Sequence, residues 1–116
     1  MAVTMGATQL WTEEVIAFGA AATSAAIDIG KASAMALHIT ALAGTLPDIT
    51  FTYSLSNSRE GTYVTPTAPV TIGANIAAAD VLDFSPEAAQ FIKITATNNS
   101  GANAATLTAQ LAVQEL

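Results

Sequence analysis

Hydrophobic and polar residues alternate along most of this chain with a period of two, a pattern typical of half-buried β-strands. The clearest case is residues 49–55, where large apolar residues take the odd positions and threonine or serine takes the even ones. We expect further strands at residues 14–20, 26–30, 35–40, 70–72, 90–97 and 107–113. Each strand is therefore expected to turn one row of side chains toward a common core.

Clusters of turn-forming residues separate these segments, for example Asn-Ser-Arg-Glu-Gly at 57–61 and Asn-Asn-Ser-Gly at 98–101. Residues 74–82 are dense in alanine, so a short helical turn is the alternative there. The chain has no long amphipathic helix pattern. We therefore predict an all-β fold, a single antiparallel, jelly-roll-like β-sandwich of about seven to eight strands.

The first part of the chain lacks this alternation. We interpret residues 1–12 as an N-terminal arm and residues 13–116 as the β-sandwich domain. The sole tryptophan, Trp11, lies near the end of the arm. A large apolar group on an otherwise aperiodic segment favours an arm that reaches a neighbouring subunit. The alternative is a first edge strand that packs on its own sandwich.

The composition changes this picture in one respect, the scarcity of charge. Only 10% of the 116 residues are charged and 52% are hydrophobic, whereas roughly 25% charged residues is usual. A folded monomer of this size exposes on the order of 5,900 Å², which leaves about 490 Å² for each charged side chain. We therefore expect other protein subunits to cover much of the surface.

Charge and apolar patterning also exclude several classes of partner. The net charge is −6, and the only cations besides one histidine are Lys31, Arg59 and Lys93. Binding to nucleic acid needs clustered lysine and arginine, so it is not expected. Gly19, Gly30 and several polar residues interrupt the most apolar region, so we expect no membrane span. The first residues lack the pattern of a signal peptide.

No residues indicate catalysis. The chain has no cysteine and none of the common nucleophile, phosphate-binding or zinc motifs, so we expect neither an enzyme nor a cofactor. The single histidine, His38, lies on the more polar face of its strand and is interpreted as a surface or interface residue. Asp80, Asp83 and Glu87 surround an expected corner at residues 82–86, and we interpret them as solvated loop acids. A cation site there is the alternative.

Four residues are candidates for a protein interface: Trp11, Phe91, Tyr63 and His38. Phe91 lies on the outward phase of its strand beside Lys93 and Thr95, and Tyr63 follows a glycine turn. An exposed phenylalanine on a sheet more often marks a protein interface than a sugar site. A carbohydrate-binding module, which would use such aromatic residues as open platforms, is an alternative.

Two segments taken together show a family resemblance. Residues 53–66 are similar to a strand–turn–strand of small phage virion proteins, and residues 84–99 resemble their later aromatic-Ile-basic-Ile strand. Residues 24–30 fit the same pattern. The chain thus resembles head or tail accessory proteins of tailed phages, with capsid cement (decoration) proteins closest in role. Galactose-binding-like jelly rolls share both features, but Ser58-Arg59-Glu60 replaces their aspartate before the turn glycine, so no ligand site is carried over.

The resemblance implies a non-enzymatic structural protein present in many copies on the capsid surface of a virion. Its partners would be the major capsid protein and further copies of itself, as a homotrimer or another homo-oligomer. It would be made in the host cytoplasm. A component of the tail or baseplate is the alternative location that the same surface chemistry allows.

Overall fold

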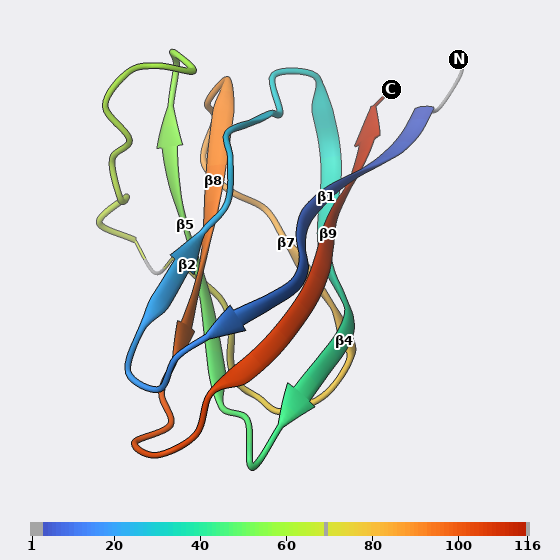
Figure 1. Cartoon of the computed structure of the whole chain (residues 1–116). Helices are drawn as coiled ribbons and strands as arrows, with labels where there is room; N and C mark the ends of the chain where they lie inside the picture. The colour runs from blue at the N-terminus through green and yellow to red at the C-terminus, as the bar shows by residue number, and fades with distance from the viewer. Residues whose placement is uncertain (1–3, 69, 116) are drawn as a thin grey trace.

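A computed structural model describes residues 4–68 and 70–115, which form nine strands in two antiparallel sheets (Figure 1). Sheet A has the order β1 (Thr4–Ile16), β9 (Ala105–Glu115), β4 (Ala32–Gly44) and β7 (Asp80–Phe84). Sheet B has the order β2 (Ala21–Thr23), β8 (Phe91–Asn98), β5 (Ile49–Ser56) and β6 (Thr71–Ile76), and β3 (Ile27–Asp28) also pairs with β8. The predicted all-β sandwich is confirmed, with nine strands in the described residues where seven to eight were expected.

The core lies between the two sheets, and period-two alternation builds it. On β5 and β8 every second side chain is buried, and the threonines and serines between them face outward. The largest fully buried side chains come from both sheets: Phe51, Leu37, Ile49, Ile92, Ile94, Leu107 and Leu111. The alternation at residues 49–55, 90–97 and 107–113 therefore predicts both the strands and their inward faces.

The alternative of a helical turn at residues 74–82 is wrong. These residues contribute to β6, which pairs with β5, and to β7, which pairs with β4. The corner expected at 82–86 is also displaced, because β7 continues through Phe84 before the chain turns. Backbone hydrogen bonds to neighbouring strands outweigh the helix propensity of alanine here.

The segment interpreted as an arm pairs with the sandwich as far as the structure describes it. Residues 4–12 belong to β1, which runs antiparallel to β9 from Thr4↔Glu115 to Ile16↔Ala105. Trp11 is only 5% exposed, and its ring lies 6.4 Å from that of Phe51 in the opposite sheet. Burial of this large apolar ring holds β1 against the sandwich, and the strand order makes β1 an edge strand of sheet A. Residues 1–3 lie outside the described residues.

One buried polar side chain ties the end of β1 to the turn before β9. Asn98 is fully buried, and its Nδ2 donates to the carbonyl oxygens of Ile16 and Asn103, each at 3.0 Å. Its Oδ1 accepts from the backbone N–H of Ser100 at 3.0 Å. Buried amides require such partners, and this one has three. Asn98 therefore joins two segments that are far apart in sequence.

Candidate interaction surfaces

The first candidate surface lies at one end of the outer face of sheet B. Phe91 and Lys93 on β8 point outward because Ile92 and Ile94 occupy the buried phase. The loop after β5 folds back over this face, so that the Arg59 guanidinium carbon lies 4.8 Å from the centre of the Phe91 ring. The Lys93 ammonium lies 4.3 Å from the centre of the Tyr63 ring. We call these four residues the cation–aromatic cluster.

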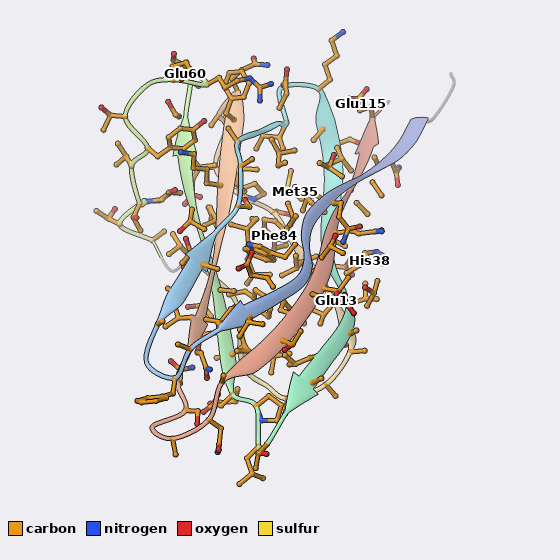
Figure 2. All side chains as sticks on the ribbon, viewed as in Figure 1. Glu13, Met35, His38, Glu60, Phe84 and Glu115 are labelled. Carbon is orange, nitrogen blue, oxygen red and sulfur yellow. The ribbon has the colours of Figure 1, made fainter. Side chains whose placement is uncertain are left out.

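Hydrogen bonds hold the loop in this position. The Tyr63 hydroxyl donates to the Arg59 carbonyl at 3.0 Å, and Arg59 Nη1 donates to the Ala26 carbonyl at 3.1 Å. Asn57 Oδ1 accepts from the Gln90 backbone N–H at 3.1 Å. Glu60 lies near the tip of the same loop (Figure 2). Hydrogen bonds and cation–ring contacts thus both join the loop after β5 to the start of β8.

The cluster brings together two of the four interface candidates, Tyr63 and Phe91, with two of the chain's three lysines and arginines. Cation–π contacts of this kind contribute about 0.5–1 kcal/mol each at exposed sites. A cation covers a face of each ring, whereas a stacking site for a sugar needs an open ring face. One face of each ring is therefore occupied by a cation and is not open for stacking against a sugar.

The second candidate surface is a shallow groove of about 220 Å³ on the outer face of sheet A. It is lined by three alanines, Ala34, Ala36 and Ala112, and by Met35, His38, Val81, Asp83 and Gln114. His38 pairs with Val81 on β7 and with Gln110 on β9, and it lies on the side of the sheet away from sheet B (Figure 2). We call this the His38 groove.

Alanines form the floor of the His38 groove, Asp83 adds one carboxylate to its lining, and Val81 beside it is 55% exposed. Small side chains let another backbone approach closely, and exposed apolar side chains favour contact with protein. The groove lies on the opposite side of the sandwich from the cation–aromatic cluster. The four predicted residues therefore fall in three places: Tyr63 with Phe91, His38 in the groove, and Trp11 in the core.

The sequence interpretation did not single out Arg59, Lys93 or Val81 as site residues. Lys93 shares the outward phase with Phe91, so its place could be found from the alternation. Arg59 reaches Phe91 only through the fold of its loop, and Val81 reaches His38 only through the pairing of β4 with β7. No local pattern in the sequence indicates either contact.

The three acids near the expected corner have separate partners. Asp80 Oδ1 accepts from the Val81 backbone N–H at 2.8 Å, and Glu87 Oε1 accepts from the Tyr53 hydroxyl at 2.6 Å. Asp83 lies on β7 opposite Ala36. Within residues 4–68 and 70–115, no three histidines, aspartates or glutamates form a group that could hold a metal ion. In the same residues, no helix is long and apolar enough to cross a membrane.

The bond between Tyr53 and Glu87 changes the acidity of both groups. Burial of the phenol, with further contributions from the hydrogen bond and the charge of Glu87, raises the pKa of Tyr53 to about 12. The hydrogen bond from Tyr53 and a backbone hydrogen bond lower the pKa of the exposed Glu87 carboxyl. The Tyr53 ring also packs 5.8 Å from that of Phe84. The pair anchors the segment after β7 to the core.

Comparisons with known proteins show similarity at the level of the fold. No protein-family model and no curated protein sequence matches the chain. The fold is similar to that of the SPBc2 prophage-derived protein YomS, with a TM-score of 0.59 over 99% of this chain and 96% of that one, at 13% sequence identity. A second similar structure is the cyanophage Pam1 capsid asymmetric unit, with a TM-score of 0.44, 16% identity, and coverage of 97% of this chain and 82% of that one. At 13% identity the likeness to YomS shows the fold alone, and the second likeness is too low to carry an argument.

Proposed function

We propose that this chain is a non-enzymatic phage structural protein that binds and stabilises a capsid shell in many copies, as a cement or decoration protein. The observation that carries the proposal is the outer face of sheet A. One of its two inner strands, β9, presents only uncharged side chains on the outward phase: Thr106, Thr108, Gln110, Ala112 and Gln114.

Such a face suits a passive contact with another protein. A charged side chain that is buried against a partner loses hydration and needs a compensating partner, whereas threonine and alanine need little compensation. The whole surface of 6183 Å² carries twelve lysine, arginine, aspartate and glutamate side chains, roughly one per 500 Å², which is sparse for a protein surface. A stable contact buries about 800 Å² on each partner, which is about an eighth of this surface.

Three further points support a phage role. The YomS likeness joins this fold to a prophage-derived protein. Residues 53–66 and 84–99, which resemble virion accessory proteins, meet at the cation–aromatic cluster. The cations over Tyr63 and Phe91 also disfavour the carbohydrate-binding alternative.

The proposal is tested on gradient-purified virions of a phage that encodes the chain. We expect mass spectrometry to find the chain in many copies and gold-labelled antibody to decorate the head. Label on the tail would contradict the cement role and support the tail or baseplate alternative. Absence of the chain from virions would contradict both.

A second experiment tests the contact itself. Heads that lack the chain are incubated with purified protein, and binding is measured by co-sedimentation. Ala34→Glu places a charge in the His38 groove, and we expect it to weaken binding at least tenfold. The matched control is Ala21→Glu, also at an exposed alanine but on sheet B, and it should bind as the wild type does. Equal binding by both variants would exclude the His38 groove as the contact.

A further inference from the structure

The first half of β1 is an edge with free backbone groups. β1 is the outermost strand of sheet A, and in the described residues it pairs only with β9. From Thr4 to Gln9 the register with β9 is regular, so every second residue turns its N–H and C=O away from the sheet. Gly6, Ala7, Thr8 and Gln9 are all exposed, so burial of side chains does little to hold this half in place.

The second half of β1 is protected in ways that the first half is not. Two register shifts, between Gln9 and Trp11 and between Trp11 and Glu14, interrupt the ladder, and Glu13 has a φ of 48°. Gln9 Nε2 donates to the Trp11 carbonyl at 2.7 Å, and the Glu13 N–H donates to Thr108 Oγ1 at 2.9 Å. Bulges and charged residues are common devices that prevent edge-to-edge pairing. Residues 4–9 contain no charge, proline or bulge.

The other sheet edges in the described residues are also protected. β2 and β3 are only three and two residues long. β6 has register shifts against β5. β7 is five residues long and carries Asp80 and Asp83. The start of β1 thus stands out as a regular, uncharged edge, and it lies beside the end of β9 at one corner of the sandwich (Figure 1).

We propose that this edge pairs antiparallel with the same edge of a second copy, which makes one continuous eight-stranded sheet from two copies of sheet A. Side chains alternate between the two faces of a sheet, so a two-fold axis perpendicular to it requires one residue to lie opposite itself. Within the regular stretch Thr4–Gln9, the five residues Met5–Gln9 can pair with their own copy about Ala7 as the centre. The pairing therefore places Ala7 opposite Ala7, and Gly6 opposite Thr8, with about four to six hydrogen bonds between copies.

The small, uncharged side chains of Gly6, Ala7 and Thr8 make a second copy of the same stretch a compatible occupant. The chain has a net charge of −6, so most contacts between two copies bring like charges together. The carboxylates nearest the paired stretch, Asp28 and Glu115, line a hollow together with Gly6, Ala7 and Thr8. The stretch itself carries no charge, and the two Glu13 side chains lie about 40 Å apart along it. That separation is well beyond the Debye length of about 8–10 Å at moderate ionic strength.

The size of the contact sets its strength. Five residues of strand extend about 17 Å, so the edge alone buries much less than the 800 Å² of a stable dimer. We therefore expect a reversible, concentration-dependent dimer in solution. On a shell that holds many copies, the local concentration would favour the same pairing. The inference rests on the proposed function only for this abundance of copies, and its tests use the purified chain alone.

Cysteine cross-linking tests the register directly, because the chain has no native cysteine. Residues opposite each other in an antiparallel pair have Cα atoms about 4.5–5.5 Å apart, within the range that a disulfide spans. We expect Ala7→Cys to form disulfide-linked dimers under mild oxidation at least tenfold faster than Ala21→Cys, an exposed alanine on the short edge strand β2. Equal rates for the two variants would overturn the proposal.

Sedimentation velocity over a range of concentrations tests the pairing without a cross-link. Ala7→Lys places two ammonium groups opposite each other, and like charges in that position destabilise a pair. We expect a dimer in the wild type and in Ala21→Lys, and at least tenfold weaker dimerisation in Ala7→Lys. A wild type that stays monomeric at millimolar concentration, or an Ala7→Lys variant that dimerises like the wild type, would overturn the inference. Neither result depends on virions, so the proposed function stands or falls separately.

Discussion

Tyr53 shows how a single residue combines a core position with polar chemistry. Its ring belongs to the alternating row that fills the sandwich, while its hydroxyl reaches Glu87 at 2.6 Å. The alternation at residues 49–55 predicts the buried ring but contains nothing about the carboxylate, which lies 34 residues later in the chain. Sequence therefore predicts the apolar role of this residue, and only the fold shows the polar one.

The raised pKa of Tyr53 predicts a loss of stability at high pH. In the unfolded chain the phenol ionises near pH 10, but in the folded protein it stays neutral up to about pH 12. The folded state therefore binds more protons between these values, and stability falls as the pH rises from 10 to 12. Thermal unfolding in this range should show a smaller fall for Tyr53→Phe. Identical pH profiles for the two proteins would contradict the assignment.

The lowered pKa of Glu87 predicts a second change in stability, at acid pH. Its pKa is lower in the folded protein, so its contribution to stability is present above the unfolded pKa of about 4.3 and is lost as the pH falls through the folded value. Tyr53→Phe removes the main cause of this shift. The difference in melting temperature between wild type and variant should therefore narrow below about pH 4, as differential scanning fluorimetry can measure. Tyr63→Phe is the control, since its hydroxyl bonds to a backbone carbonyl instead.

At the scale of elements, Asn98 controls how β1 ends and β9 begins. Asn98→Ala removes two donors and one acceptor from a buried site, which leaves the Ile16 carbonyl without this partner. We expect a loss of about 1–3 kcal/mol in the free energy of unfolding, measured by urea denaturation. The matched control is Asn99→Ala, whose Nδ2 donates to Thr50 Oγ1 at 2.7 Å in an exposed position. Loss of this exposed hydrogen bond should change stability by about 0.5 kcal/mol or less. Equal losses in the two variants would argue against a special role for the buried amide.

The strands that follow the period-two pattern without interruption could be predicted from sequence, and the others could not. β5 and β8 keep a strict alternation, so both their extent and their inward faces follow from the residues alone. β1 has two register shifts around Trp11, and each shift breaks the alternation. From sequence alone, this aperiodic segment is therefore interpreted as an arm, although in the structure its pairing with β9 makes it a strand. The alanines near β6 and β7 obscure those strands in a different way, through their helix propensity.

At the scale of the whole molecule, the packing of Trp11 on Phe51 joins the two sheets. Trp11 is the sole tryptophan, so its fluorescence reports the contact between β1 and sheet B. We expect a blue-shifted emission in the folded protein and a single urea transition, with the same midpoint by fluorescence and by far-ultraviolet circular dichroism. A fluorescence transition at a lower urea concentration than the circular dichroism transition would show that β1 detaches before the rest of the sandwich unfolds.

The candidate surfaces also belong to this scale, because each needs strands from different parts of the chain. The cation–aromatic cluster brings Arg59 to Phe91, and the His38 groove brings His38 on β4 to Val81 on β7. The outward phase of Phe91 could be predicted, since it follows from alternation within one strand. The cations over the aromatic rings and the alanine floor of the groove depend on loop geometry and sheet order, which no local pattern encodes.

The pairing of β1 with β9 has a consequence for how the chain folds as it is made. Ile16 cannot pair with β9 until its partner Ala105 has been translated. Ala105 follows about 90 residues later, a delay of roughly 5–20 seconds at usual elongation rates. During that interval Trp11 and Ile16 have no completed sheet A to bury them. Sheets built from such distant partners also fold slowly, because closing a long loop precedes any gain from contact. A nascent chain of this protein is therefore expected to bind molecular chaperones until β9 emerges.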